Sequence, residues 1–242
     1  MGMNKLYISG ANLPNNLYID CSLSYNKPER RVSSYSIPGR SGNLIVDEKT
    51  PQNDVVYDNV LIPYPAFIHG NFKSTWDSLI NSIGRLQGYR KIQCDDDPTH
   101  YRMGRVIIPQ APNVKHIGED AFFNLSFDCK PQRFLNTGDE WVTWSGSLSN
   151  PTNYDSYPLL KVTGTGTLYF SAGNLTVTIS SNTAYTYIDC ESMTCYYDSS
   201  TPLNQYVSFD KPYFPVLVQG SNSVTKSAGI TKIEVKPRWW EL

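Results

Sequence analysis

Hydrophobic and polar residues alternate with the two-residue period of β-strands along much of the chain. With Gly, Pro and Asn between the runs, this pattern predicts a mainly β protein with many turns. Pro63 and Pro65 indicate an edge strand or a bent one, because proline has no N–H to donate. In the first half, strands are expected at residues 6–8, 17–19, 55–68, 89–94, 101–109 and 121–129.

Residues 72–86 are the stretch with the clearest helical periodicity. Ser74 is expected to cap this helix and Asp77 to support its first turn, while Gly84 and Gly88 are expected to end it. The apolar stripe is expected to pack on a sheet. It consists of Trp76, Leu79, Ile80, Ile83 and Leu86.

Residues 36–44 carry the signals of a tight turn between two strands. Pro38 ends the first strand, and Gly39 and Gly42 can adopt the positive φ that a reversal needs. An apolar strand restarts at residues 44–46. The prediction is a hairpin with Arg40 at its tip, and an ordinary surface turn is the alternative.

Polar stretches mark the connections and a boundary in the middle of the chain. The turn 95–98 and the stretch 112–120 are expected to join three strands into a meander, and Lys130-Pro131 to end the first half. Residues 136–157 are poor in apolar side chains, which indicates a domain boundary. Trp141 and Trp144 argue against a fully loose linker there. The short alternating strands that follow predict a β-sandwich.

Composition and charge exclude several classes of function. The chain has 242 residues and a formal net charge of −1, so no global field attracts nucleic acid or an acidic membrane. It has no apolar run long enough to span a bilayer and no signal-peptide pattern at its start. The five cysteines do not indicate a disulfide framework. Cys94 and Cys129 are expected to be buried apolar residues; Cys190 and Cys195 are expected to be free thiols, with a disulfide or half a metal site as alternatives.

Candidate chemistry is sparse. The three histidines have no Ser or Cys partner at motif spacing, so no catalytic residue and no cofactor is predicted. The cluster 95–97 with His100 could bind a divalent cation, but a solvated acidic turn is favoured and no metal site is predicted. The many aromatic residues of the second half fit either a sugar-binding surface or the sandwich core, and we favour the core.

Five segments, in this order and spacing, resemble the distal tail protein (Dit) family of long-tailed bacteriophages (siphophages). The resemblance covers nearly the whole chain, although no single motif is specific. The segments are Ile37-Pro38-Gly39-Arg40-Ser41-Gly42, Cys94–Tyr101, the strand 123–134 with Lys130-Pro131, the junction 150–158, and Trp239-Trp240.

The resemblance implies an α+β N-terminal belt domain with one helix at residues 1–135, a linker at 136–149 and a galectin-like β-sandwich at 150–242. It implies a non-enzymatic homohexameric ring in the virion, at the phage tail tip. Such a ring is a baseplate hub that joins the tail tube protein above to the tail-associated lysin or tip protein and the receptor-binding proteins below. DNA would only pass through the ring. The chain has no room for an inserted carbohydrate-binding module, so direct host binding is not expected.

Subunit contacts are expected at exposed strand edges, which a neighbouring chain can extend. The candidate interface residues are Ile37, Gly39, Arg40, Gly42, Tyr57 and Ile62. The alternative function is a carbohydrate-binding module or a lectin-like adhesion protein; a glycosidase has the least support. The sandwich has no polar cluster of the His-x-Asn-x-Arg type, so we do not expect galectin-type sugar affinity.

Overall fold

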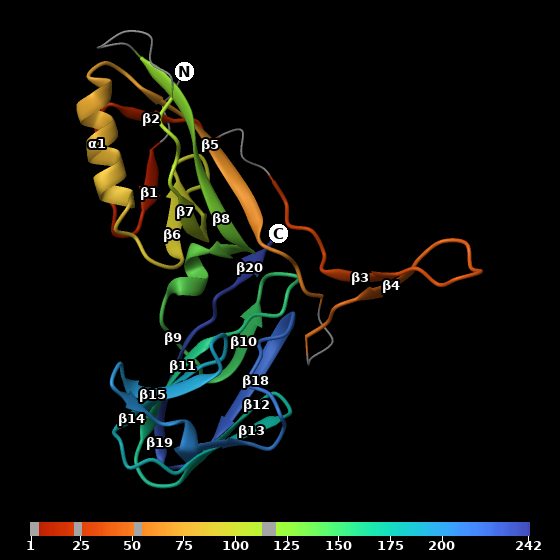
Figure 1. Cartoon of the computed structure of the whole chain (residues 1–242). Coiled ribbons are helices and arrows are strands. Elements are labelled where there is room, and N and C mark those ends of the chain that lie inside the picture. Colours follow the sequence, from red (N-terminus) through yellow and green to blue (C-terminus); the bar gives the residue numbers. More distant parts are fainter. Residues whose placement is uncertain (1–4, 22–25, 51–54, 113–119) are drawn as a thin grey trace. The chain divides into compact units, whose positions relative to one another are not determined.

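The computed structural model describes residues 5–21, 26–50, 55–112 and 120–242. The chain divides into two compact units, which we call unit 1 (residues 1–133 with Leu242) and unit 2 (residues 134–241). Each unit has its own hydrophobic core. The protein is mainly β, as the alternating pattern predicts (Figure 1).

Unit 1 is built on an antiparallel sheet whose strands run in the order β1-β6-β7-β8-β5-β2. The short strand β20 (Trp240–Glu241), which also pairs β8, belongs to unit 2. The turn 95–98 joins β6 to β7, which confirms the first half of the predicted meander. Residues 113–119, in the second predicted connection, lie outside the described residues. The other strands are β1 (Leu6–Ile8), β2 (Leu17–Ile19), β5 (Val60–Ile68), β6 (Arg90–Cys94), β7 (His100–Ile107) and β8 (Ala121–Leu135).

The helix α1 (Phe72–Ile83) packs its apolar face on this sheet (Figure 1). Leu79 and Ile83 are buried in the same core as the inward-facing residues of β5. The predicted cap at Ser74 is wrong: Asn71, at φ 44°, is the N-cap residue, and the Ser74 hydroxyl donates to its carbonyl oxygen at 3.1 Å. Ser74 already lies inside the first turn, and its hydroxyl donates to a carbonyl oxygen instead of accepting from one of the free N–H groups of the helix start. No helix among the described residues is long and apolar enough to cross a membrane.

Strand β8 continues past Lys130-Pro131, where the first half was expected to end. Its pairing with β5 ends at Cys129, opposite Val60. The missing N–H of Pro131 therefore costs no hydrogen bond to β5, and the extended conformation suits proline.

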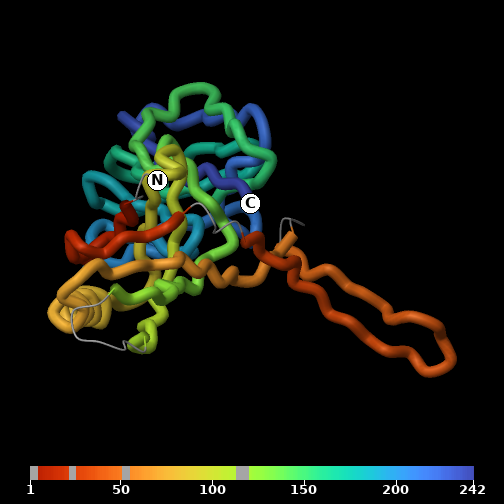
Figure 2. Tube along the Cα trace, turned by 90° about the horizontal axis from the view of Figure 1, so that it is seen from above, coloured from red at the N-terminus to blue at the C-terminus, as the bar shows by residue number. Residues whose placement is uncertain are grey.

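The predicted hairpin is confirmed. β3 (Val32–Tyr35) and β4 (Leu44–Asp47) form a separate two-stranded antiparallel sheet. Gly39 and Gly42 have φ angles of 79° and 80°, as the reversal requires. The hairpin extends away from the body of unit 1 (Figure 2).

Unit 2 is a β-sandwich, as predicted, because buried residues of both its sheets belong to one core. The five-stranded sheet has the order β10-β18-β12-β13-β17 and the other sheet β16-β15-β14-β11-β19-β9. The first consists of β10 (Gly146–Asn150), β18 (Gly220–Lys226), β12 (Leu168–Ala172), β13 (Leu175–Ile179) and β17 (Val207–Phe209). The second consists of β16 (Thr201–Pro202), β15 (Thr194–Asp198), β14 (Tyr185–Asp189), β11 (Leu159–Gly164), β19 (Ile230–Lys236) and β9 (Val142–Thr143). Two short 3-10 helices, η1 (Asn136–Asp139) and η2 (Asn204–Tyr206), complete the unit.

Residues 136–149, expected to be a linker, are folded into unit 2. They form η1, β9 and the first part of β10. Trp144 is buried in the core, and its indole N–H donates to the carbonyl oxygen of Asn222 at 3.3 Å. Short polar strands at a sheet edge have the same composition as a linker, so composition alone could not distinguish an edge strand from a linker.

One pair of cysteines forms a disulfide, although the sequence predicted no disulfide there. Cys94 is bonded to Cys21 in a disulfide, where a buried free thiol was expected. The two residues are separated by 73 positions, so the chain pattern gives no sign that they meet. Cys129, Cys190 and Cys195 are free and buried, as predicted.

Candidate subunit interface

The hairpin tip brings four of the six candidate interface residues together. Gly39 and Gly42 flank the turn, and the Arg40 N–H donates to the Ile37 carbonyl oxygen at 3.2 Å. The side chains of Ile37 and Arg40 are exposed. The tip therefore offers a guanidinium and an apolar side chain to another surface.

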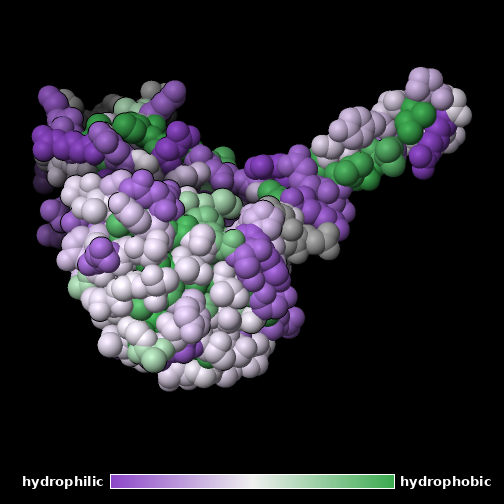
Figure 3. Space-filling model, turned by 90° about the horizontal axis from the view of Figure 1, so that it is seen from below, coloured by the Kyte–Doolittle hydropathy of each residue, from purple (hydrophilic) through white to green (hydrophobic). Residues whose placement is uncertain are grey.

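Both faces of the hairpin carry exposed apolar side chains. Tyr35 lies opposite Leu44 and shares a face with Val46, while Val32 and Ile45 lie on the other face. All five are exposed, and Ile45 is 63% exposed. Figure 3 shows hydrophobic residues along the hairpin beside strongly hydrophilic ones. A two-stranded sheet alone is at best marginally stable in water, and these side chains add no buried core to it.

An ion-pair cluster holds the base of the hairpin to the strand connection behind it. Arg31 Nε lies 2.8 Å from Asp58 Oδ1 and 3.9 Å from Glu48 Oε2. The Arg31 N–H also donates to the Val56 carbonyl oxygen at 2.9 Å. Tyr57 lies here, in a bridge with the residue before Arg31, and not at the tip.

Ile62 is a correction to the candidate set. Its side chain is fully buried in the core of unit 1, because alternate residues of β5 face inward. The neighbouring Leu61 points outward and is 53% exposed. One edge of β5 pairs with β8 over all of residues 60–68. On the other edge, β2 pairs only with residues 66–68 and does not reach residues 60–65. On that side, the Asp20 N–H donates to the Pro65 carbonyl oxygen at 2.8 Å, and Asn26 donates to the Leu61 carbonyl oxygen.

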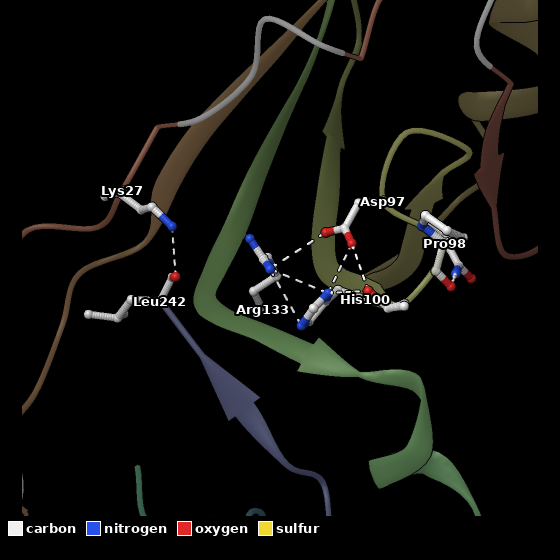
Figure 4. A network of polar contacts seen from close by, with 8 residues as sticks. Lys27, Asp97, Pro98, His100, Arg133 and Leu242 are labelled. Atoms are coloured by element: carbon white, nitrogen blue, oxygen red, sulfur yellow. Dashed lines mark hydrogen bonds and ion pairs between the residues drawn. The ribbon is translucent and has the colours of Figure 1, made fainter. Parts of the chain in front are cut away.

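A polar network occupies the acidic turn in which a cation site was considered. His100 Nδ1 lies 2.9 Å from Asp97 Oδ1, and Arg133 Nε lies 3.5 Å from Asp97 Oδ2 (Figure 4). Burial alone would raise the pKa of Asp97, but hydrogen bonding and charge from His100, together with Arg133, lower it below its usual value. Among the described residues, no group of three His, Cys, Asp or Glu side chains is placed to hold a metal ion.

The aromatic residues of unit 2 divide between the core and the surface. Phe170 is buried in the core, as favoured by the sequence. Tyr187 instead stacks on Tyr196 at 5.3 Å between ring centroids, and Lys161 Nζ lies 4.7 Å from the ring centroid of Tyr185. These rings are half-buried and lie on the six-stranded sheet. The sequence therefore did not show which aromatic side chains face the core and which face outward.

With this architecture, the chain has the fold of the hub proteins found in phage tail baseplates. The crystal structure of the phage SPP1 Dit protein (gp 19.1), described as a paradigm of the hub adsorption apparatus in phages infecting Gram-positive hosts, aligns with a TM-score of 0.68. The alignment covers 97% of this chain and 98% of that chain at 12% identity.

Two structures of the phage P2 baseplate in its activated conformation share the fold. The calcium form aligns with a TM-score of 0.54 at 8% identity, covering 91% of this chain and 89% of that chain. The strontium form aligns with a TM-score of 0.55 at 8% identity, covering 97% and 98%. No protein-family model and no curated protein sequence matches the chain.

Proposed function

We propose that this protein is a structural, non-enzymatic distal tail protein that assembles into a homohexameric ring at the tip of a phage tail. The observation that carries the proposal is the exposed apolar hairpin on a chain that shares its fold with a baseplate hub protein over nearly its full length. The ring would be a hub between the tail tube and the tail-tip and receptor-binding proteins. Its location would be the virion, and DNA would pass through its centre.

The N-terminal domain, residues 1–135, is the part we assign to the ring, and the sandwich of residues 150–242 is the part we assign to a galectin-like outer domain. A ring is a head-to-tail assembly, so each subunit must present two different surfaces. The hairpin is one of them: it extends beyond the body of unit 1 (Figure 2), and no described residue covers its exposed apolar side chains. Arg40 at the tip carries a forked set of donors for a neighbour's carboxylate or carbonyl groups.

The test is the mass of the intact chain and of two valine variants. Val46 on the hairpin and Val218 in unit 2 are both 48% exposed, so Val46→Asp and Val218→Asp add the same charge to equally exposed positions. Native mass spectrometry should give about six times the chain mass for the wild type and for Val218→Asp. Val46→Asp should give single chains, because a charge at the contact has to be desolvated on assembly. A wild type that stays monomeric at high concentration, or a Val46→Asp ring, contradicts the proposal.

A carbohydrate-binding role for unit 2 is the second candidate. The observation in its favour is the row of rings on the six-stranded sheet, where Trp141 lies 6.1 Å from Tyr187 between ring centroids. Trp141 is 41% exposed, so part of its ring is accessible. A glycan array probed with the wild type and with Trp141→Ala tests this role: specific glycans bound by the wild type and lost in the variant support it, and an array without specific signals excludes it for those glycans.

A further inference from the structure

Unit 1 contains a cavity that the ring proposal does not use. Its volume is about 70 Å³, several times the ~10–15 Å³ that one water molecule needs. Basic side chains from three segments of the chain line it, namely Lys27, His100 and Arg102 of β7, and Arg133, together with the carboxylates of Asp96 and Asp97. The Asp97 network of Figure 4 forms part of the same wall.

Arg102 is the unusual member of this lining. It belongs to β7, is only 9% exposed, and its Nη1 is buried without a hydrogen-bond partner. Guanidinium stays charged in proteins, and burying a charge without a partner destabilises the folded state. Such an arrangement is unfavourable unless an anion reaches the group.

The groups next to Arg102 give it no direct ion pair, although the charge of Asp97 acts on it from a distance. Burial raises the pKa of Tyr64 and that of Cys129 to about 12 each, so both are neutral at pH 7. Asp97 already contacts His100 and Arg133. Among the residues that the structure describes, no carboxylate forms an ion pair with Arg102.

We propose that this cavity binds a small inorganic oxyanion of the phosphate type, with the Arg102 guanidinium as its buried ligand. The planar fork of a guanidinium matches two oxygens of such an ion. Arg133 and Lys27 lie in the same lining and add positive charge around it. The ion would neutralise the buried charge and so stabilise the folded sheet of unit 1. This site is independent of the proposed ring.

The experiment measures thermal unfolding and binding heat of the full chain with inorganic phosphate, at ionic strength held constant with sodium chloride. A ligand that binds only the folded state stabilises it in proportion to ln(1 + [L]/Kd), so the midpoint of unit 1 unfolding should keep rising with phosphate. Arg102→Met should abolish both this rise and the calorimetric binding signal. Without phosphate, the variant should be at least as stable as the wild type, because it removes an uncompensated buried charge.

Arg105→Met is the matched control. Arg105 lies on the same strand, but its side chain is 65% exposed and it contacts Asp128 rather than the cavity. This variant should keep the full phosphate response, which separates the site from the general stabilising effect of phosphate. If Arg102→Met does not fold, Arg133→Gln takes its place and should weaken phosphate binding at least several-fold. An equal response in wild type and variant, an equal effect of chloride, or no binding heat in the wild type overturns the proposal.

Discussion

At the residue scale, the best-defined ion pair of unit 2 joins Asp189 to Arg238. Arg238 Nη1 lies 2.6 Å from Asp189 Oδ1, and Nη2 lies 3.2 Å from Oδ2. The backbone N–H groups of Glu191 and Ser192 donate to the same carboxylate. Arg238 itself has a φ angle of 56°, and its N–H donates to the carbonyl oxygen of Gly138. The pair therefore fixes an unfavourable backbone conformation directly before Trp239.

We predict that Asp189→Asn lowers the free energy of unfolding of unit 2 by about 3 kcal/mol at pH 7, because the variant leaves the largely buried Arg238 with only the more exposed Glu191 carboxylate, at 3.4 Å, as counter-charge. Burial alone would raise the pKa of Asp189, but hydrogen bonds and charge from Arg238, with the two backbone N–H groups, lower it. The pKa of this carboxyl is lower in the folded state than in the unfolded state, where it is about 3.9. Its ionised form therefore stabilises the fold above pH 3.9, and this stabilisation is lost as the pH falls from there through the folded-state pKa.

Calorimetric unfolding of wild type and variant at pH 7 and pH 3 checks this prediction. The difference between them should be large at pH 7 and should shrink at pH 3. Glu140→Gln, at an exposed position of the same unit, is the control and should change little at either pH. A difference that does not depend on pH would mean that the loss comes from packing and not from the carboxylate charge.

At the scale of elements, the sequence predicts what is encoded locally. Pro38, Gly39 and Gly42 lie within a few residues of each other, so the hairpin and its turn could be located from the chain alone. The cap of α1 was missed by a few residues, because Ser74 and Asn71 are both good capping residues and only geometry separates them. The inward direction of Ile62 depends on which face of β5 the helix covers. That choice is made by distant parts of the chain, so the sequence alone could not show that Ile62 faces the core.

The turn at Gly39 gives a prediction for the hairpin as an element. Gly39 has a φ angle of 79°, and an added Cβ would meet no atom within 4 Å. Gly39→Val therefore costs about 1–2 kcal/mol of backbone strain and creates no clash. Because the hairpin shares no core with the sheet, we expect the unfolding midpoint of unit 1 to stay unchanged while the ring dissociates at higher protein concentration than the wild type.

Gly173→Val is the comparison for this prediction. Gly173 has a φ angle of 62°, equally open surroundings and a place in the β12–β13 turn of unit 2. It should keep wild-type assembly in a concentration series followed by light scattering. Equal assembly in both variants would show that the conformation of the hairpin tip is irrelevant to the contact.

At the scale of the whole molecule, the two units have separate cores and should unfold as separate transitions. The Cys21–Cys94 disulfide lies in unit 1 and spans 73 positions, which corresponds to about 4 kcal/mol in the chain-entropy description. Reduction, or the double change Cys21→Ser with Cys94→Ser, should lower the unfolding temperature of unit 1 and leave that of unit 2 unchanged. Scanning calorimetry with and without reductant measures this; a shift of both transitions, or of neither, contradicts it.

The sequence could indicate that there are two structural halves, but not how the chain passes between them. The change in composition after residue 135 lies close to the boundary of the units. Trp144, however, belongs to the core of unit 2, and the last residue, Leu242, groups with unit 1. Both depend on contacts between residues far apart in the chain, which periodicity and composition do not encode.

The pairing of the two ends of unit 2 has a consequence for how such proteins can diversify. The Leu135 N–H donates to the Trp239 carbonyl oxygen at 2.9 Å, so the chain leaves unit 2 beside the place where it came in. In the chain, unit 2 begins within the last residues of β8 and is followed by Leu242, which groups with unit 1. A different module whose own ends lie equally close could replace it without lengthening or rerouting the sheet of unit 1. Recombination at these two adjacent points would then change what the protein displays while its scaffold stays constant.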